Sequence, residues 1–301
     1  MWKLKVLIQF ILALLPAGER INHLMQIINR SHSNDETLKN TANLAEKIRI
    51  IGEFVDLEGS TVVEVGTGWD AISAILFYLM GTRTCYTYDH LPHVRFKLVR
   101  KIVNQIEAHI DSIQPITSVP KSILTARLAR LQGKNTLKEL LAAGNINYQA
   151  PNDATQSGLP NNSVDLYYAY AVLEHVPENI VDAIIIEAKR VLKEQGRVYF
   201  AIGLHDHYAG FDANVSKINF LKYPEWLWSF FVKNKISYHN RLRGKQFLDL
   251  FKSHGARIEW INSKIDPADL EVLKTMKIDR RFDGMTHEEL AVNYLELIFS
   301  F

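Results

Sequence analysis

The sequence has almost no cysteine, no strong charge imbalance and no long hydrophobic run. Its 301 residues include one cysteine, Cys85, which excludes a disulfide framework and a cysteine-based zinc site and favours a reducing cytoplasm. The formal net charge of +2 gives no reason to expect a nucleic-acid partner. Internal repeats and low-complexity tracts are also missing. The hydrophobic content of 47% suffices for a full core, as one large domain or a domain with appendages.

An apolar run near the N-terminus, Val6 to Leu15, is too short to cross a membrane, which takes about 20 residues. Two lysines precede the run and Pro16 ends it. We expect a docked amphipathic or buried helix, within a helical extension that covers residues 1–55. Two alternatives remain open: a helix that contacts a membrane surface through residues 1–15, or a signal peptide that ends near Ala17-Gly18.

The segment from Thr61 to Asp70 is the most informative part of the chain. A β-branched run ends in Gly66-Thr-Gly68, and a helical pattern of apolar residues follows from Ala71. This order predicts a strand, a tight glycine turn and a helix N-terminus, which together bring backbone amides against a nucleotide-like ligand. The turn alone is a weak signal, because many βα units contain Gly-x-Gly by chance.

Strand-like and helical patterns alternate along most of the chain, which predicts a parallel sheet with helices on both faces. Gly81 and Gly196 are expected to close two of the helices. Residues 111–144 read as a helical insertion with a basic face, either a solvated cover or, alternatively, a surface for phosphate or lipid. The predicted strands are residues 61–65, 84–88, 146–148, 164–170, 198–202, 257–261 and 292–299. The predicted helices are residues 36–54, 70–80, 94–108, 123–131, 136–143, 180–192, 244–254 and 266–276.

Two ligand classes fit a glycine turn after the first strand: dinucleotides and S-adenosylmethionine. The position three after Gly68 is Ala71, which the dinucleotide fingerprint also permits, so glycine spacing does not decide between them. Downstream motifs do distinguish them. Over residues 60–204 the chain resembles the class I S-adenosylmethionine-dependent methyltransferases, in the group with a Leu-Pro…Asp…Leu-Glu-His signature. The matching motifs, in order, are Glu64-Val-Gly66-Thr-Gly68, Asp89, Asp153-Ala154, Gly158-Leu-Pro160 to Asp165, Tyr170 to Val176 with Leu173-Glu174-His175, and Lys189 to Lys193.

The resemblance implies a fold and a cofactor site. The fold is a Rossmann-like seven-stranded methyltransferase sheet, mostly parallel with an antiparallel last strand, over residues 56–301. S-adenosylmethionine is the implied cofactor. The resemblance assigns its methionine and ribose to the amides around the glycine turn and to acidic strand ends, its adenine to a later loop, and its methionine end to the loop after the fourth strand. The cofactor residues it implies are Glu64, Gly66, Thr67, Gly68, Trp69, Asp89, Asp153, Ala154, Tyr170, Glu174 and His175.

Trp69-Asp70 departs from the family pattern, which continues to a third glycine. Trp69 is expected to pack beneath the cofactor, and Asp70 to cap the helix that follows.

His205-Asp206-His207 follows the fifth predicted strand, where an acceptor would meet the transferable methyl group. Histidine takes a proton from a hydroxyl or amine near neutral pH, and a nearby carboxylate can orient it, so we expect these three residues to be catalytic. A polar loop without a catalytic role is one alternative. Ligation of a metal is another, but residues adjacent in sequence rarely all face one ion, and we expect no metal site. Tyr208, Asn240 and Arg241 are candidate contacts to the acceptor; equally, Asn240 and Arg241 could cap a helix and pair with surface carboxylates. We expect the aromatic segment 223–231 to pack in the core or a lid, with a lipid or sugar platform as the alternative, because Trp and Tyr suit an apolar, partly wet site.

These observations predict a cytoplasmic methyltransferase, with peripheral membrane contact as an option. The expected reaction is O-methylation of a small or envelope-related acceptor, such as a glycan or lipid, by in-line displacement. A nicotinamide-dependent oxidoreductase would share the glycine turn and Asp89 but would leave Leu173-Glu174-His175 unexplained. A non-catalytic cofactor-binding module is the other alternative.

Overall fold

The computed structural model describes residues 2–28 and 37–301. The described residues contain one seven-stranded sheet in the order β3-β2-β1-β4-β5-β7-β6, with its last strand antiparallel, as predicted. The strands are β1 (Thr61–Val65), β2 (Thr84–Tyr88), β3 (Ile146–Gln149), β4 (Val164–Tyr170), β5 (Leu192–Gly203), β6 (Arg257–Ile265) and β7 (Val292–Ser300). The helices are α1 (Trp2–Leu14), α2 (Gly18–Ile28), α3 (Thr37–Ile51), α4 (Ile72–Met80), α5 (Phe96–Ala108), α6 (Ile110–Thr117), α7 (Lys121–Leu131), α8 (Leu137–Ala143), α9 (Glu178–Val191), α10 (Glu225–Phe231), α11 (Gly244–Ser253), α12 (Pro267–Leu273) and α13 (His287–Ala291).

The chain forms two compact units that are each built from several segments. Unit 1 comprises residues 1–29, 170–185 and 200–297, and unit 2 comprises residues 30–169, 186–199 and 298–301. The predicted extension 1–55 is therefore shared, because α1 and α2 count with unit 1 and α3 with unit 2. The predicted polar break at residues 31–35 lies outside the described residues.

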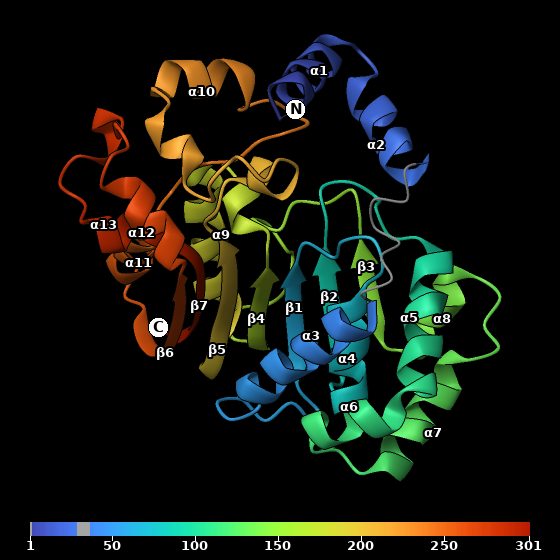
Figure 1. Cartoon of the computed structure of the whole chain (residues 1–301). Helices are drawn as coiled ribbons and strands as arrows, with labels where there is room; N and C mark the ends of the chain where they lie inside the picture. Colours follow the sequence, from blue (N-terminus) through green and yellow to red (C-terminus); the bar gives the residue numbers. More distant parts are fainter. Residues whose placement is uncertain (1, 29–36) are drawn as a thin grey trace. The chain divides into compact units, whose positions relative to one another are not determined.

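Unit 2 contains the parallel half of the sheet. β1 pairs in parallel with β2 on one side and β4 on the other, and β3 pairs with β2 (Figure 1). All five residues of β1 are buried, which explains its unbroken β-branched character. α4 is buried over most of its length, and the insertion packs α7 against it through Leu124 and Leu128. The insertion is thus a packed part of this unit.

One predicted boundary in unit 2 is wrong. Gly196 does not close a helix: α9 ends at Val191, β5 begins at Leu192, and Gly196 lies inside this strand. A Cβ on Gly196 would come within 2.7 Å of a Leu192 side-chain carbon and 3.0 Å of the Asp165 carbonyl oxygen. The glycine is therefore required by close packing in the sheet rather than by a helix end.

Unit 1 contains a second core around α10, α12 and α13, to which α1 contributes Val6. Trp2 also packs there, with its ring 5.6 Å from that of Tyr208 and 5.9 Å from that of Tyr223. Among the described helices, none combines the length and the hydropathy that crossing a membrane requires.

A buried arginine, Arg243, links separate backbone segments of unit 1. Arg243 is fully enclosed, and its guanidinium donates to the carbonyl oxygens of Leu204 at 2.6 Å and Leu290 at 2.9 Å, and also to that of Val292. Burial lowers the pKa of Arg243 to about 9. The hydrogen bonds to these three carbonyl groups replace the water that the cation loses on burial.

Candidate cofactor and acceptor sites

The glycine turn between β1 and α4 has the backbone conformation that the sequence predicts. Gly66 and Gly68 have φ angles of 84° and 69°, in the region that favours glycine. A Cβ on Gly68 would meet no atom within 4 Å, so a ligand can approach the backbone there. The N-cap position of α4 is Ala71 rather than Asp70. The Asp70 carboxylate nevertheless accepts from the Ile72 N–H at 3.2 Å, so it satisfies one donor of the helix start.

Glu64 is a buried carboxylate at the core of this site. It accepts from the Thr87 hydroxyl at 2.7 Å, and the hydroxyls of Thr87 and Thr67 lie 2.6 Å apart. Burial raises the pKa of Glu64 to about 7. A positively charged ligand nearby would favour the ionised form, and S-adenosylmethionine carries a sulfonium and an ammonium group.

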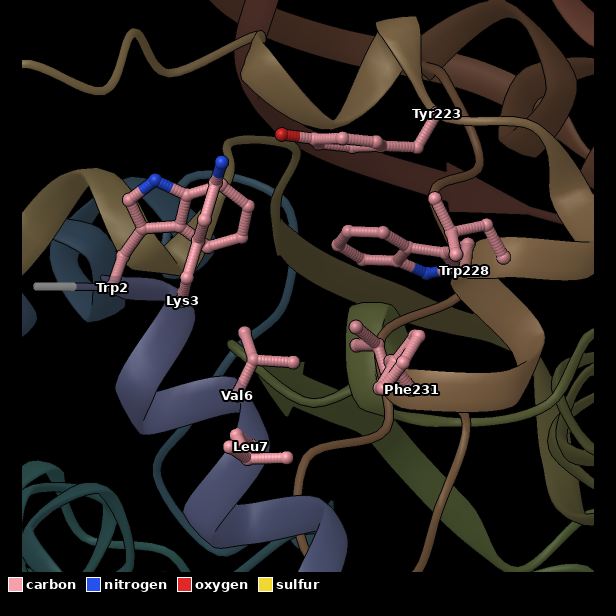
Figure 2. Close-up of a pocket in the computed structure, with 9 residues that line it drawn as sticks. Trp2, Lys3, Val6, Leu7, Tyr223, Trp228 and Phe231 are labelled. Carbon is pink, nitrogen blue, oxygen red and sulfur yellow. The ribbon is translucent and has the colours of Figure 1, made fainter.

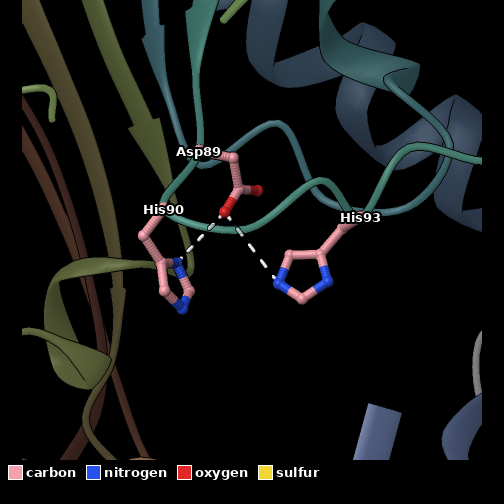
Figure 3. A group of neighbouring side chains, drawn as sticks. All are labelled: Asp89, His90 and His93. Carbon is pink, nitrogen blue, oxygen red and sulfur yellow. Dashed lines mark hydrogen bonds and ion pairs between the residues drawn. The ribbon is translucent and has the colours of Figure 1, made fainter. Parts of the chain in front are cut away.

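Asp89 links the glycine turn to the loop after β2. One carboxylate oxygen accepts from the Gly68 N–H at 3.3 Å, and the other lies 3.1 Å from His90 Nδ1 and 3.9 Å from His93 Nε2 (Figure 3). The Trp69 ring lies 5.0 Å from that of His93 and the Trp69 carbonyl accepts from the Arg95 N–H. Trp69 thus packs on this loop, and its placement beneath the cofactor stays a prediction.

The loop after β3 also comes to Asp89. The Asn152 N–H donates to the Asp89 carbonyl at 2.9 Å. Asp153 is exposed, and one of its oxygens accepts from the amide and the hydroxyl of Thr155 at 2.9 and 2.7 Å, so it forms the turn. The Ala154 carbonyl accepts from the Tyr167 hydroxyl at 3.2 Å. Contact of Asp153 and Ala154 with adenine stays a prediction.

The residues predicted for the methionine end lie in unit 1, in and after the last residue of β4. Tyr170 is half-buried, and burial raises its pKa. Glu174 is buried and accepts from the Gly203 N–H at 3.1 Å, whereas His175 is exposed. The turn that carries them is held by Asn240, whose side-chain amide donates to the carbonyl oxygens of Leu173 at 2.7 Å and Val176 at 2.9 Å.

The predicted catalytic trio separates in the structure. His205 and His207 are half-buried with ring centres 4.9 Å apart, and burial lowers the pKa of both, that of His207 to about 3. Asp206 is fully buried. One of its carboxylate oxygens accepts from the Tyr208 N–H at 2.8 Å, and the other accepts from the Asn219 side-chain amide at 2.9 Å. Asp206 therefore shapes its own loop and does not orient a histidine, which corrects its predicted catalytic role.

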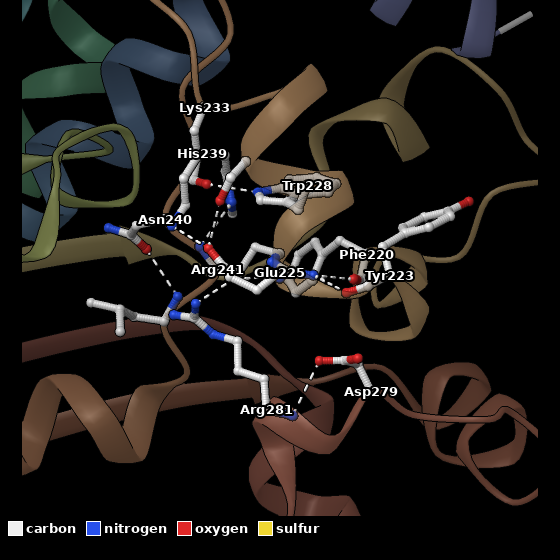
Figure 4. Close-up of polar contacts among 12 residues, drawn as sticks. Phe220, Tyr223, Glu225, Trp228, Lys233, His239, Asn240, Arg241, Asp279 and Arg281 are labelled. Atoms are coloured by element: carbon white, nitrogen blue, oxygen red, sulfur yellow. Dashed lines mark hydrogen bonds and ion pairs between the residues drawn. The ribbon is translucent and has the colours of Figure 1, made fainter.

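Arg241 and Tyr208 also differ from their predicted role as acceptor contacts, because their polar atoms serve the protein itself. Arg241 is fully enclosed and donates to the carbonyl oxygens of Phe220 at 2.9 Å and Tyr223 at 2.6 Å, and to Glu225 at 2.6 Å (Figure 4). It therefore holds the aromatic segment in place. The buried Tyr208 donates its hydroxyl to Gln9 of α1 at 3.2 Å. Asn240, as described, supports the Glu174-His175 turn.

The sequence analysis did not identify four residues at these sites: Thr87, His90, His93 and His239. Thr87 lies on β2, two positions before Asp89, which directly follows that strand, and His90 and His93 lie in the Asp-His-Leu-Pro-His run. Local spacing therefore gives a sequence signal for all three residues. His239 is buried next to His207, with ring centres 4.7 Å apart. No local pattern connects these two histidines, because they are distant in the sequence.

Comparison with known proteins finds similarity to methyltransferases. Residues 122–200 match the family model described as a methyltransferase domain. No curated protein matches the chain. An S-adenosylmethionine-dependent methyltransferase from Mesorhizobium loti is 16% identical, with 85% of this chain and 97% of that chain covered and a TM-score of 0.45. A geranyl diphosphate C-methyltransferase from Streptomyces coelicolor, in complex with Mg²⁺, geranyl-S-thiolodiphosphate and S-adenosylhomocysteine, is 11% identical, with 84% and 74% covered and a TM-score of 0.45.

The matched segment includes the second part of the insertion from residue 122, the Asp153 loop, β4 and the Leu173-Glu174-His175 turn, whereas the glycine turn precedes it. The seven-stranded sheet that contains this segment has the architecture that the motifs predicted. Residues 122–200 are thus similar to a methyltransferase domain, and the assignment of S-adenosylmethionine-dependent methyl transfer to the whole chain is taken up below as a proposal.

Proposed function

We propose that this protein transfers the methyl group of S-adenosylmethionine to the oxygen of a small, largely apolar acceptor. The observations that support the cofactor half are the hydrogen bond from the Gly68 amide to Asp89, the buried Glu64 carboxylate that accepts from Thr87, and the open space at a Cβ built on Gly68. In this proposal Asp89 accepts hydrogen bonds from the ribose hydroxyls, and Glu64 and the turn amides hold the methionine and ribose.

The chemistry requires little from the protein beyond alignment and one proton transfer. The sulfonium is an activated donor: the acceptor oxygen attacks the methyl carbon in line as the sulfur–carbon bond breaks and the sulfur keeps the electron pair. An acceptor hydroxyl must also lose its proton. His205 is the proposed base, because it lies directly after β5 and a neutral imidazole can accept a proton; burial lowers the pKa of this ring, which favours its neutral form.

Cofactor binding is tested by calorimetric titration of the purified chain with S-adenosylmethionine, S-adenosylhomocysteine and NADH. Asp89→Asn should weaken S-adenosylmethionine binding about 10- to 100-fold, because hydrogen bonds to a charged group contribute roughly 1.5–3 kcal/mol. Asp111→Asn, at an exposed ion pair with Lys121, is the matched control and should bind as wild type does. Binding of NADH in preference to S-adenosylmethionine would refute the proposal and favour an oxidoreductase. Cofactor binding without turnover of any acceptor would favour a non-catalytic module.

An apolar pocket in unit 1 supports an acceptor with a hydrocarbon part. Its volume is about 330 Å³, and α1 faces the aromatic segment across it. Figure 2 shows Trp2, Val6 and Leu7 on one side and Tyr223, Trp228 and Phe231 on the other. A single isoprenoid or acyl chain suits walls of this kind.

The exposed surface around this pocket supports an acceptor that resides in a membrane. On α1, Leu4 and Leu14 are 62% and 70% exposed, and on α10, Trp226 is 71% exposed. Leu7, Ile8, Ile11 and Phe230 are also exposed, and Lys3 and Lys5 supply positive charge on α1. Apolar side chains, aromatic rings and lysines together favour an anionic bilayer surface as the occupant, with the protein in the cytoplasm.

Membrane contact is tested by co-sedimentation with vesicles of phosphatidylcholine alone or mixed with phosphatidylglycerol. We expect binding to the mixed vesicles that weakens with salt, and a loss of binding in Leu7→Ser and Trp226→Ser. Ile261→Ser, at an exposed apolar position of β6, should bind as the unchanged protein does. Equal recovery in the supernatant with and without vesicles would refute membrane contact and leave methyl transfer untouched.

A further inference from the structure

Unit 1 contains a cluster of four histidines and a glutamate, and the proposed base, His205, is only one of them. The turn after β4 contributes Glu174 and His175, the loop after β5 contributes His205 and His207, and the segment before α11 contributes His239. The His207 ring lies at the centre, 4.8 Å from the ring of His175, 4.9 Å from that of His205 and 4.7 Å from that of His239.

Three of these residues bring possible ligand atoms close together. One oxygen of Glu174 and one ring nitrogen each of His175 and His207 all lie within 4.8 Å of one another. Glu174 is 2% exposed; its Oε1 accepts from the Gly203 N–H, whereas its Oε2 is buried and has no hydrogen-bond partner. His207 Nδ1 is likewise buried without a partner. Buried polar atoms in this state are costly, and a cation between them would remove that cost.

The surroundings favour metal ligation over a simple polar cluster. His175 Nδ1 lies 3.0 Å from the Tyr238 carbonyl oxygen, so this nitrogen carries the proton and Nε2 keeps its lone pair outward. Such a hydrogen bond to a carbonyl is the usual way in which a protein orients a histidine ligand.

We propose that Glu174, His175 and His207 bind one divalent transition-metal ion, with Zn²⁺ as the reference ion. Two histidines and one carboxylate leave coordination positions open, as in catalytic zinc and non-haem iron sites. An acceptor oxygen at an open position would lose its proton more readily, and His205, adjacent to His207, would receive that proton. This acceptor role rests on the proposed methyl transfer, whereas metal binding itself does not.

Metal binding is tested on the untagged full-length chain, treated with a chelator and titrated with Co²⁺ and Zn²⁺ without S-adenosylmethionine. We expect one ion per chain by calorimetry, and the visible absorption of Co²⁺ held by nitrogen and oxygen ligands. His207→Ala and Glu174→Gln should each weaken binding by on the order of 100-fold or more. Glu174→Gln keeps the acceptor for the Gly203 N–H, so its thermal midpoint checks that the fold is intact. His254→Ala, at a histidine that pairs with Asp182, should bind the ion as wild type does.

A wild-type chain that binds neither ion, or variants that bind as tightly as wild type, would overturn the metal site. The proposed function has its own readout, since S-adenosylmethionine titration does not require the ion. Loss of Co²⁺ binding with intact cofactor binding would therefore remove only the metal site. The reverse result would remove only the methyl donor.

Discussion

Replacing Glu64 by glutamine should change the pH dependence of stability in a way that a surface carboxylate cannot. In the folded chain the pKa of Glu64 is about 7, whereas the ordinary value is 4.5. The native state thus retains a proton between these values that the unfolded state has released. The contribution of Glu64 to native stability is therefore greatest below pH 4.5 and falls as the pH rises to about 7, by about 3 kcal/mol at 1.36 kcal/mol per pKa unit.

Glu64→Gln removes this titration while keeping an acceptor for the Thr87 hydroxyl. Relative to wild type, the variant should gain about 3 kcal/mol between pH 4.5 and pH 8, or about 6 °C in thermal midpoint at roughly 2 °C per kcal/mol for a chain of this size. The assay is thermal unfolding of both proteins across this range, with Glu107→Gln on the exposed face of α5 as control. A difference between variant and wild type that does not change with pH would refute the argument.

Three further results are expected. Gly68→Ala should fold, at a cost of about 1–2 kcal/mol for its left-handed backbone, but should lose at least tenfold in S-adenosylmethionine affinity by calorimetry, because its Cβ fills the space at the turn. Asn240→Ala should lower the thermal midpoint by several degrees, because the buried carbonyl groups of Leu173 and Val176 lose their donor at about 1–3 kcal/mol each. His205→Ala should reduce the single-turnover rate at pH 7 by about 10²-fold or more with little change in cofactor affinity; an unchanged rate would exclude it as the base.

The order of the strands was accessible from the sequence, because each strand of the sheet has its own local signal, whereas short helices such as α10 and α13 were not predicted. The β-branched run of β1, the glycine turn after it and Asp89 at the end of β2 are all read from neighbouring residues. The early start of β5 was not accessible. Gly196 looks like a helix end from its neighbours alone, whereas its true constraint is the Asp165 carbonyl of another strand.

The acceptor-side residues were harder to predict for a similar reason. From the sequence, Arg241 was predicted to contact a ligand. Its partners are backbone carbonyl groups, and because every residue has one, no sequence pattern reveals them. His239 joins the histidine cluster only through tertiary packing across a long sequence separation. By contrast, His205 and His207 were found because they directly follow a strand end, where local reading suffices.

The buried guanidinium of Arg243 has a consequence for exchanging parts between relatives. Its planar, forked guanidinium donates to carbonyl groups of two separate segments. Leu204 begins the loop that carries His205 and His207 (the histidine loop), and Leu290 and Val292 lie at the entry to β7. Lysine lacks that fork and cannot serve both segments at once. A histidine loop transplanted from another methyltransferase should therefore be accepted only together with a matching residue 243 and a matching β7 entry. The loop after β5, residue 243 and the entry to β7 are distant in the sequence, but we expect them to change together among relatives.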